Sequence, residues 1–123
     1  MKILVFGNPL VPQDSLPLKI ANKIKIPGVT FKELEPSIDE LTDEGRDLII
    51  LDTVINTDKV RVIENIDAII TEKIYSLHDF DLGHTLKLLK KMELIDSVKI
   101  ICVPQSISEA EAIKQVKNVI KPI

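Results

Sequence analysis

The chain has 123 residues, of which 45% are hydrophobic but only 3% are aromatic, and its formal net charge is −3. The negative charge and the few aromatic rings argue against a nucleic-acid-binding protein, which uses basic surfaces and stacking side chains. No apolar run approaches the roughly 20 residues that span a bilayer, so we expect no membrane association. Given its length, we expect a single domain over residues 1–123. Cys102 is the single cysteine, which excludes an internal disulfide and fits a cytoplasmic protein.

The first half of the chain alternates between strand and helix patterns. KILVFG (residues 2–7) is a continuous apolar run that ends in glycine, which is typical of a strand buried on both faces. Residues 16–24 follow a proline-containing loop and carry apolar side chains at helical spacing. VTFKELE (29–35) alternates like a half-exposed strand, and SIDELTDEG (37–45) has the capping residues and final glycine of a short helix.

The middle of the chain continues this alternation. DLIILD (47–52) reads as a second buried strand, closed by Asp52. KVRVIEN (59–65) predicts a strand near the edge of the sheet, and DAIITE (67–72) predicts a further short strand. Leucines at helical spacing then predict a helix from about 80 to 92.

The last two elements complete the pattern. VKIICVP (98–104) predicts the last buried strand, and residues 106–120 predict a closing helix with Ser108 and Glu111 as a capping box. Strands that alternate with helices predict an α/β domain of three layers. We therefore expect a mostly parallel central sheet of about five strands with helices on both faces, of the phosphorylase/hydrolase-like type.

Three polar residues fall where such a sheet places its ligands, beyond the carboxyl ends of the strands. Asp14 lies in the loop after the first strand, Asp52 ends the 47–52 strand, and His78 precedes the 80–92 helix. Two carboxylates and an imidazole suit a divalent transition metal and leave coordination positions open. The positions predict a candidate metal site if the three side chains converge.

Each of these residues also has a purely structural interpretation. Asp14 would cap the first helix, and Asp52 would be an ordinary turn residue at a strand end. His78 would be a loop histidine that is hydrogen-bonded to Asp79 or Asp81. Spacing alone leaves both interpretations open.

The remaining candidates for chemistry are weaker. Cys102 lies within an apolar strand, which indicates a buried structural thiol rather than a nucleophile. His84 projects from the predicted 80–92 helix, and Ser15 and Ser76 lack a nucleophile motif. With a lone glycine after the first strand, the sequence also lacks the glycine-rich motif that binds dinucleotides.

Three segments, ILVFGNPLVPQD, LIILDTV and SLHDFDLGHTLKLL, together resemble the hydrogenase maturation endopeptidases. The resemblance covers most of the chain and keeps the order of the family's motifs. It implies a cytoplasmic, aspartyl-type peptidase, monomeric and without an organic cofactor. Such an enzyme removes a C-terminal peptide from the large-subunit precursor of a [NiFe] hydrogenase once nickel has been inserted.

The resemblance selects the same three residues as the strand-end argument. Asp14, Asp52 and His78 match the family's metal-contacting positions, which implies that they are the catalytic residues and contact nickel supplied by the precursor. Gln13 and Ser15 depart from the family pattern, which has an acid and a glycine at these positions. Two alternatives stay open: a metal-dependent hydrolase of small molecules on the same scaffold, and a non-catalytic protein that docks on a hydrogenase precursor or assembly factor.

Overall fold

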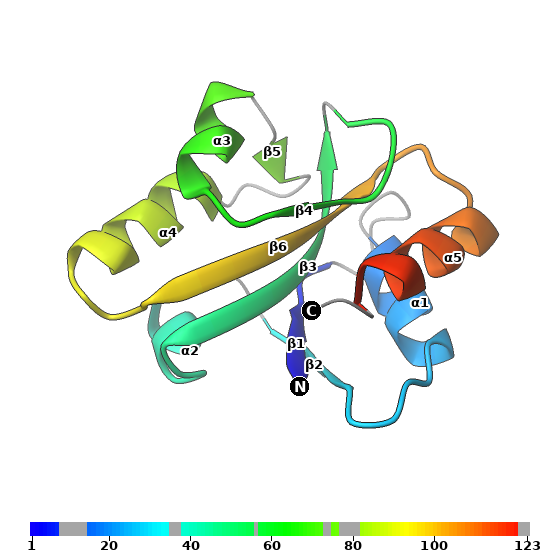
Figure 1. Cartoon of the computed structure of the whole chain (residues 1–123), viewed down its shortest axis with the longest axis horizontal. Coiled ribbons are helices and arrows are strands. Elements are labelled where there is room, and N and C mark those ends of the chain that lie inside the picture. Colours follow the sequence, from blue (N-terminus) through cyan, green and yellow to red (C-terminus); the bar gives the residue numbers. More distant parts are fainter. Residues whose placement is uncertain (8–14, 35–37, 56, 73–74, 77–81, 121–123) are drawn as a thin grey trace.

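The computed structural model describes residues 1–7, 15–34, 38–55, 57–72, 75–76 and 82–120. Six strands and five helices alternate along these residues, and Figure 1 labels them. In chain order they are β1 (Lys2–Val5), α1 (Leu16–Lys23), β2 (Thr30–Glu33), α2 (Ile38–Thr42), β3 (Asp47–Ile55), β4 (Arg61–Ile63), α3 (Ile66–Thr71), β5 (Tyr75–Ser76), α4 (Leu82–Lys91), β6 (Ser97–Pro104) and α5 (Glu109–Ile120). No helix among the described residues is both long and apolar enough to cross a bilayer.

The strands form one mostly parallel sheet in the order β2-β1-β3-β6-β4. β2, β1, β3 and β6 run parallel, and β4 runs antiparallel to β6 at one edge. β5 is a short addition that pairs antiparallel with the end of β3. The predicted α/β class and the mostly parallel sheet are confirmed, with β5 as a strand that the sequence pattern did not indicate.

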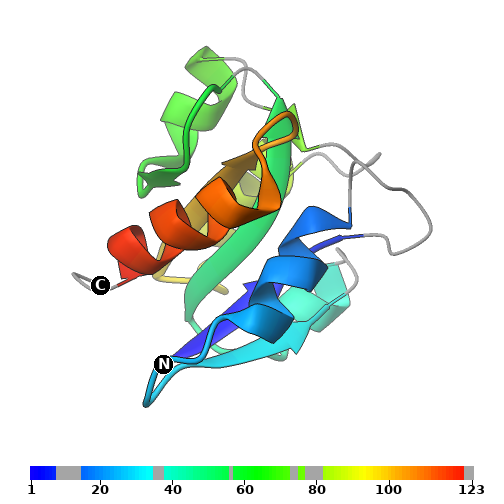
Figure 2. The ribbon, with the colours of Figure 1, turned by 90° about the vertical axis from the view of Figure 1, so that its right-hand side faces the viewer.

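Helices cover both faces of the sheet. Figure 1 shows α1 and α5 on one side and α2, α3 and α4 on the other, and Figure 2 shows α1 and α5 side by side. β3 supplies apolar side chains to both layers: Leu48 and Ile50 pack toward α2, α3 and α4, whereas Leu51 packs toward α1 and α5. The continuous apolar pattern at 48–51 follows from this double burial.

Residues 67–71 belong to helix α3, so the short strand predicted at 67–72 is wrong. Asn65 starts α3: its side-chain oxygen accepts a hydrogen bond from the Asp67 N–H at 3.0 Å, and its carbonyl accepts one from the Ala68 N–H at 3.0 Å. Ile66 and Ile69 are buried three residues apart, which is a helical spacing. A short apolar run does not distinguish strand from helix, and the capping residue decides it here.

A buried carboxylate ties the α2–β3 turn to the edge of the sheet. The Glu44 side chain is only 4% exposed and accepts hydrogen bonds from the ammonium groups of Lys2 on β1 and Lys32 on β2. These two hydrogen bonds hold the pKa of Glu44 below its ordinary value. The arrangement lies at the amino ends of the parallel strands, so it serves the fold and leaves the carboxyl ends free for a site.

Candidate functional site

Asp52 lies inside β3 and does not close it. β3 continues to Ile55, and the Asp52 side chain is 0% exposed. The prediction that the strand ends at Asp52 is therefore wrong, and so is the interpretation of Asp52 as an ordinary turn residue at a strand end. Burying a carboxylate is costly unless it is balanced by opposite charge or by hydrogen bonds, which makes this position chemically unusual.

The partners of β3 change at Asp52. On one edge, β6 accompanies β3 through Val54. On the other edge, pairing with β1 ends where the Phe6 N–H donates to the Leu51 carbonyl at 3.0 Å. β5 pairs with Val54 and Ile55 and must use this same edge, because β6 occupies the opposite one. We call Asp52 and Thr53 on this edge, between β1 and β5, the ladder break.

The two residues of the ladder break point to opposite faces of the sheet, as successive strand residues do. Asp52 shares the α3–α4 face with Cys102, its register partner on β6. Thr53 therefore faces the α1–α5 layer; it is 0% exposed, and within the described residues its hydroxyl has no hydrogen-bond partner. The break thus carries a buried oxygen on each side of the sheet.

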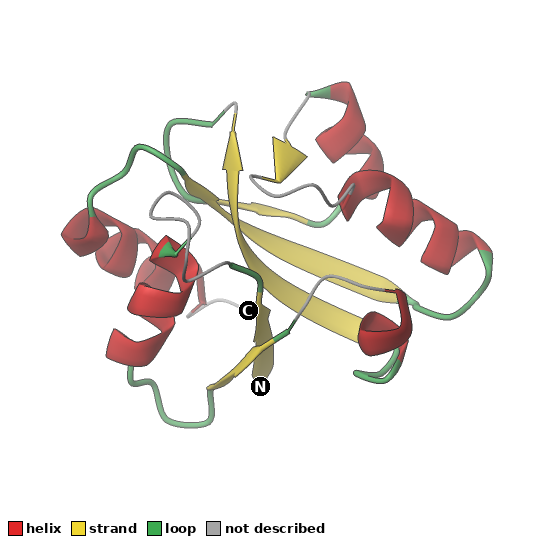
Figure 3. Ribbon diagram, turned by 180° about the vertical axis from the view of Figure 1, so that it is seen from behind, coloured by secondary structure: helices red, strands yellow, loops and turns green. Residues whose placement is uncertain are grey.

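The described chain approaches the ladder break from two directions. β1 ends at Val5 beside Leu51, and only Phe6 and Gly7 separate it from the segment 8–14. β5 runs antiparallel to β3, with Tyr75 opposite Ile55 and Ser76 opposite Val54, so it heads toward Asp52 directly before the segment 77–81. Figure 3 shows β5 beside the end of β3. Both loops that carry the other candidate residues therefore begin near the break.

Two of the three predicted site residues, Asp14 and His78, lie outside the described residues, as does Gln13. Their convergence with Asp52 stays a prediction. Among the described residues, no group of three or more His, Cys, Asp and Glu side chains is arranged to hold a metal ion.

The structure tests some of the alternative interpretations. The N-cap position of α1 is Ser15, and the interpretation of Asp14 as a helix cap lies outside the described residues. His84 is exposed on α4, as expected for a surface residue. The sequence did not single out Arg61. This residue of β4 pairs in register with Cys102 of β6, which in turn pairs with Asp52 of β3.

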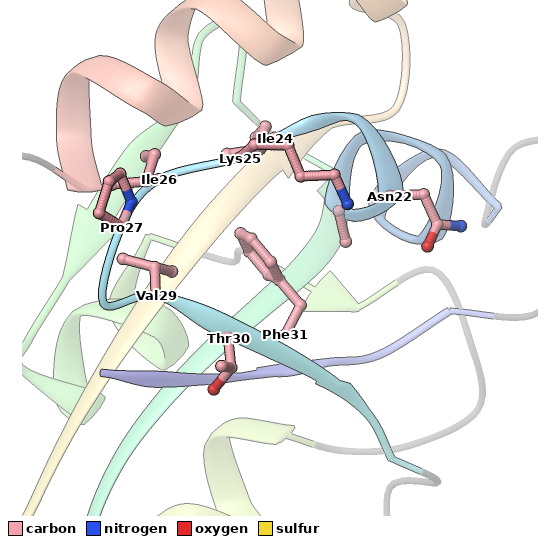
Figure 4. Close-up of a pocket in the computed structure, with 9 residues that line it drawn as sticks. Asn22, Ile24, Lys25, Ile26, Pro27, Val29, Thr30 and Phe31 are labelled. Atoms are coloured by element: carbon pink, nitrogen blue, oxygen red, sulfur yellow. The ribbon is translucent and has the colours of Figure 1, made fainter.

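A shallow groove lies at the opposite end of the sheet from the ladder break (Figure 4). Its volume is about 560 Å³, and it lies between the end of α1 and the start of β2. The apolar part of its lining comes from Ala21, Ile24, Ile26, Pro27, Val29 and Phe31. It contains no imidazole, thiol or carboxylate among its lining residues, so it offers no chemistry for a metal or a hydrolytic reaction.

Two solved structures share this fold. The [NiFe] hydrogenase maturation protease HybD from Thermococcus kodakarensis aligns over 99% of this chain and 99% of its own, with a TM-score of 0.67 and 21% identity. The hydrogenase 2 maturation peptidase from a Thaumarchaeota archaeon aligns over 98% of this chain and 99% of its own, with a TM-score of 0.51 and 17% identity. The chain has the fold of a hydrogenase maturation protease. Comparisons with known protein families and with curated proteins returned no match.

These neighbours belong to the family that the three sequence segments resemble. The resemblance is therefore confirmed at the level of the fold, over almost the whole length of both chains. At 21% and 17% sequence identity, these neighbours establish the fold but not the roles of individual residues.

Cys102 is predicted to be chemically inert. Burial raises the pKa of its thiol to about 12, and the negative charge of Asp52 adds to the shift. At pH 8 only about one thiol in 10,000 is then ionised, so iodoacetamide should leave the native protein unmodified and react fully in denaturant. Mass spectrometry measures the adduct on this single cysteine. Rapid alkylation of the native protein would contradict the assignment and favour a thiol enzyme.

Proposed function

We propose that the protein is an endopeptidase that removes a C-terminal peptide from the nickel-loaded large-subunit precursor of a [NiFe] hydrogenase. The observation that carries the proposal is the buried carboxylate of Asp52 in the ladder break, on a fold shared with maturation proteases. That carboxylate stands between the starts of the two loops that contain Asp14 and His78.

Chain geometry supports the convergence of the three residues. Consecutive Cα atoms are about 3.8 Å apart, so Asp14 is tied closely to Ser15, whose side chain is buried at the start of α1. His78 follows Ser76 by two residues, which span at most about 7 Å, and Ser76 pairs with Val54. His78 is thus anchored two residues from a backbone pair next to Asp52, and Asp14 directly precedes the first helix.

The donor set suits nickel that already sits in a substrate. Carboxylate oxygens and an imidazole nitrogen bind divalent transition metals, and three such donors leave positions for ligands from elsewhere. We propose that thiolates of the precursor supply those other ligands. Metal occupancy of the precursor then adds to its binding energy, so that an empty precursor binds weakly and escapes cleavage.

The burial of Asp52 strengthens this interaction. Water weakens the attraction between opposite charges less in an apolar interior than at the surface. A cation beside the buried carboxylate of Asp52 is therefore attracted more strongly than a cation beside an exposed one. The same burial makes replacement of the carboxylate by an amide a sensitive test, because the shape is kept and only the charge is lost.

The proposed reaction is hydrolysis of one peptide bond. A water oxygen bonds to the carbonyl carbon, the C–N bond breaks, and the proton released by the water passes to the leaving amine. Asp14 or Asp52 takes that proton as general base, or the precursor's nickel polarises the carbonyl oxygen. Either route needs only the groups named here and the substrate's own metal.

Cleavage is predicted to require nickel in the precursor. Purified protein should shorten the loaded precursor and leave the nickel-free precursor intact, because the empty precursor lacks the group that the three residues contact. Mass spectrometry of the precursor before and after incubation gives the result. Equal cleavage of both forms would contradict metal recognition, and a stable complex without cleavage of either form would favour the non-catalytic alternative.

Single substitutions in the site are predicted to act as one unit. Asp14→Asn, Asp52→Asn and His78→Ala should each lower processing by at least about 100-fold, and combining them should add little further loss. The measurement is the processing rate of each variant, with folding checked by circular dichroism.

Three variants serve as controls for that series. His84→Ala and Cys102→Ala should keep the processing rate, and Cys102→Ala should lower the free energy of unfolding by about 1 kcal/mol because a small buried group is lost. Gln13→Asp introduces the acidic residue that the family has at this position, and this variant should keep the processing rate. Normal processing by Asp14→Asn or His78→Ala would remove these residues from the site.

A further inference from the structure

Exposed apolar side chains gather at one end of α4. Of the four large apolar residues that are exposed in the described part of the chain, Leu88, Met92 and Leu94 lie within seven residues, and they are 45%, 55% and 36% exposed. The Met92 N–H donates to the Leu88 carbonyl at 2.9 Å, so these two side chains are neighbours one helical turn apart. Figure 1 shows α4 on the outside of the sheet, at the left.

Packing against the core does not explain these exposed side chains. α4 faces the core through Leu86 and Leu89, which are 0% exposed and belong to the apolar layer under α3 and α4. Leu88 lies between them in the sequence, and the helical rotation of about 100° per residue places it on the outer side of the helix. α5, by contrast, exposes no large apolar side chain. α4 therefore has a second apolar side, which the described chain leaves uncovered.

Three lysines surround this apolar surface. Lys87, Lys90 and Lys91 are exposed, and α4 contains no acidic residue. Lys87 lies 3.4 Å from a carboxylate oxygen of Asp67, but both side chains are more than 60% exposed, so the pair is weak. Attraction to the helix dipole accounts for lysines in the last turn but not for the apolar side chains between them.

We call these six residues together the α4 patch: Leu88, Met92 and Leu94 with Lys87, Lys90 and Lys91. The patch is positively charged on a chain whose formal net charge is −3. It therefore favours a partner surface that is apolar at its centre and carries carboxylates around it.

α4 leads from the candidate site to the patch. The helix begins at Leu82, four residues after His78, and it contacts β5, which pairs with β3 beside Asp52. With a rise of about 1.5 Å per residue, Leu88 lies about 9 Å and Met92 about 15 Å from the start of the helix. A stable protein complex buries about 800 Å² on each partner, which corresponds to a circle of about 16 Å radius. Three metal-contacting side chains provide far less, so a folded substrate has to contact the surface around the site.

We infer that the α4 patch is a docking surface for the hydrogenase large-subunit precursor, which meets it with an apolar surface bordered by Asp or Glu. The inference rests on the proposed function for the identity of this partner. Leu88 and Met92 supply the apolar contact, and the lysines select for the carboxylates. Because the patch is separate from Asp52, it adds affinity for the precursor whether or not nickel is present.

Processing kinetics test the patch with two double variants. Leu88→Gln with Met92→Gln, and Lys90→Glu with Lys91→Glu, should each raise KM for the loaded precursor about tenfold and leave kcat unchanged. All four side chains are exposed, so these variants should fold normally. Lys114→Glu reverses the charge of an exposed lysine on α5 and is the matched control, which should keep the native KM. A KM that stays unchanged in both double variants would overturn the inference.

Binding of the nickel-free precursor measures docking without cleavage. By surface plasmon resonance, both double variants should bind it about tenfold more weakly than the native protein, and Asp52→Asn should bind it as the native protein does. Equal binding by the native protein and the double variants would overturn the inference. If the native protein cleaves no precursor, the proposed function fails, and this binding assay still tests the docking surface by itself.

Two other occupants of the patch predict different results. If a second copy of the chain covers it, sedimentation velocity of the native protein alone will show a dimer that Leu88→Gln with Met92→Gln dissociates. If a membrane covers it, vesicles of phosphatidylcholine and phosphatidylserine will bind the native protein and not the Lys90→Glu, Lys91→Glu variant. We expect neither a dimer nor vesicle binding, and either result would overturn docking of the precursor at this surface.

Discussion

The pairing of β3 with β6 is the constraint on which the rest of the structure depends. Eight residues of each strand are in register, from Asp47 opposite Ser97 to Val54 opposite Pro104. Both strands are buried on both faces, so a slip of one residue would turn every apolar side chain to the other layer. This register fixes Asp52, Cys102 and, through β4, Arg61 at one level of the sheet.

The candidate site follows from a mismatch in strand length around this pair. β3 has nine residues and β1 only four, so β3 runs on beyond its neighbour. Along this edge, β1 pairs with β3 as far as Leu51, and β5 pairs with β3 from Val54 onward. Asp52 and Thr53 lie between these two paired stretches. A sheet built for maximal stability would place apolar side chains here, yet a fully buried carboxylate is kept. Departures of this kind from the rules of folding are expected at functional positions.

Much of the fold could be predicted from the sequence, and the failures have physical causes. The strands at 2–7, 47–52 and 98–104 were found because double burial produces continuous apolar runs. The end of β3 is not predictable in this way, because a carboxylate after an apolar run is typical of a strand end, although β3 continues through Asp52. β5 was missed because two residues are too few to form a pattern, and they pair only because β3 extends past β1.

The site was predictable only in part. Asp52 was identified as a candidate from its type and its place after an apolar run, but its burial depends on strand lengths that no local pattern gives. The sequence pattern predicts only that Arg61 belongs to a strand near the edge of the sheet. Arg61 is aligned with Asp52 across the sheet because β3 pairs with β6 and β6 pairs with β4, each in a fixed register. These pairings join strands that are far apart in the sequence, so they are known only once the sheet is assembled.

The proposed function depends on Asp14 and His78 meeting Asp52 at the ladder break. The most direct test is a crystal structure of the protein soaked with nickel, with anomalous diffraction data collected at the nickel absorption edge. The account predicts one peak at about 2.0–2.3 Å from an oxygen of Asp52, an oxygen of Asp14 and a ring nitrogen of His78. A structure in which the side chain of Asp14 or His78 points away from Asp52, or a nickel peak bound at other residues, would contradict it.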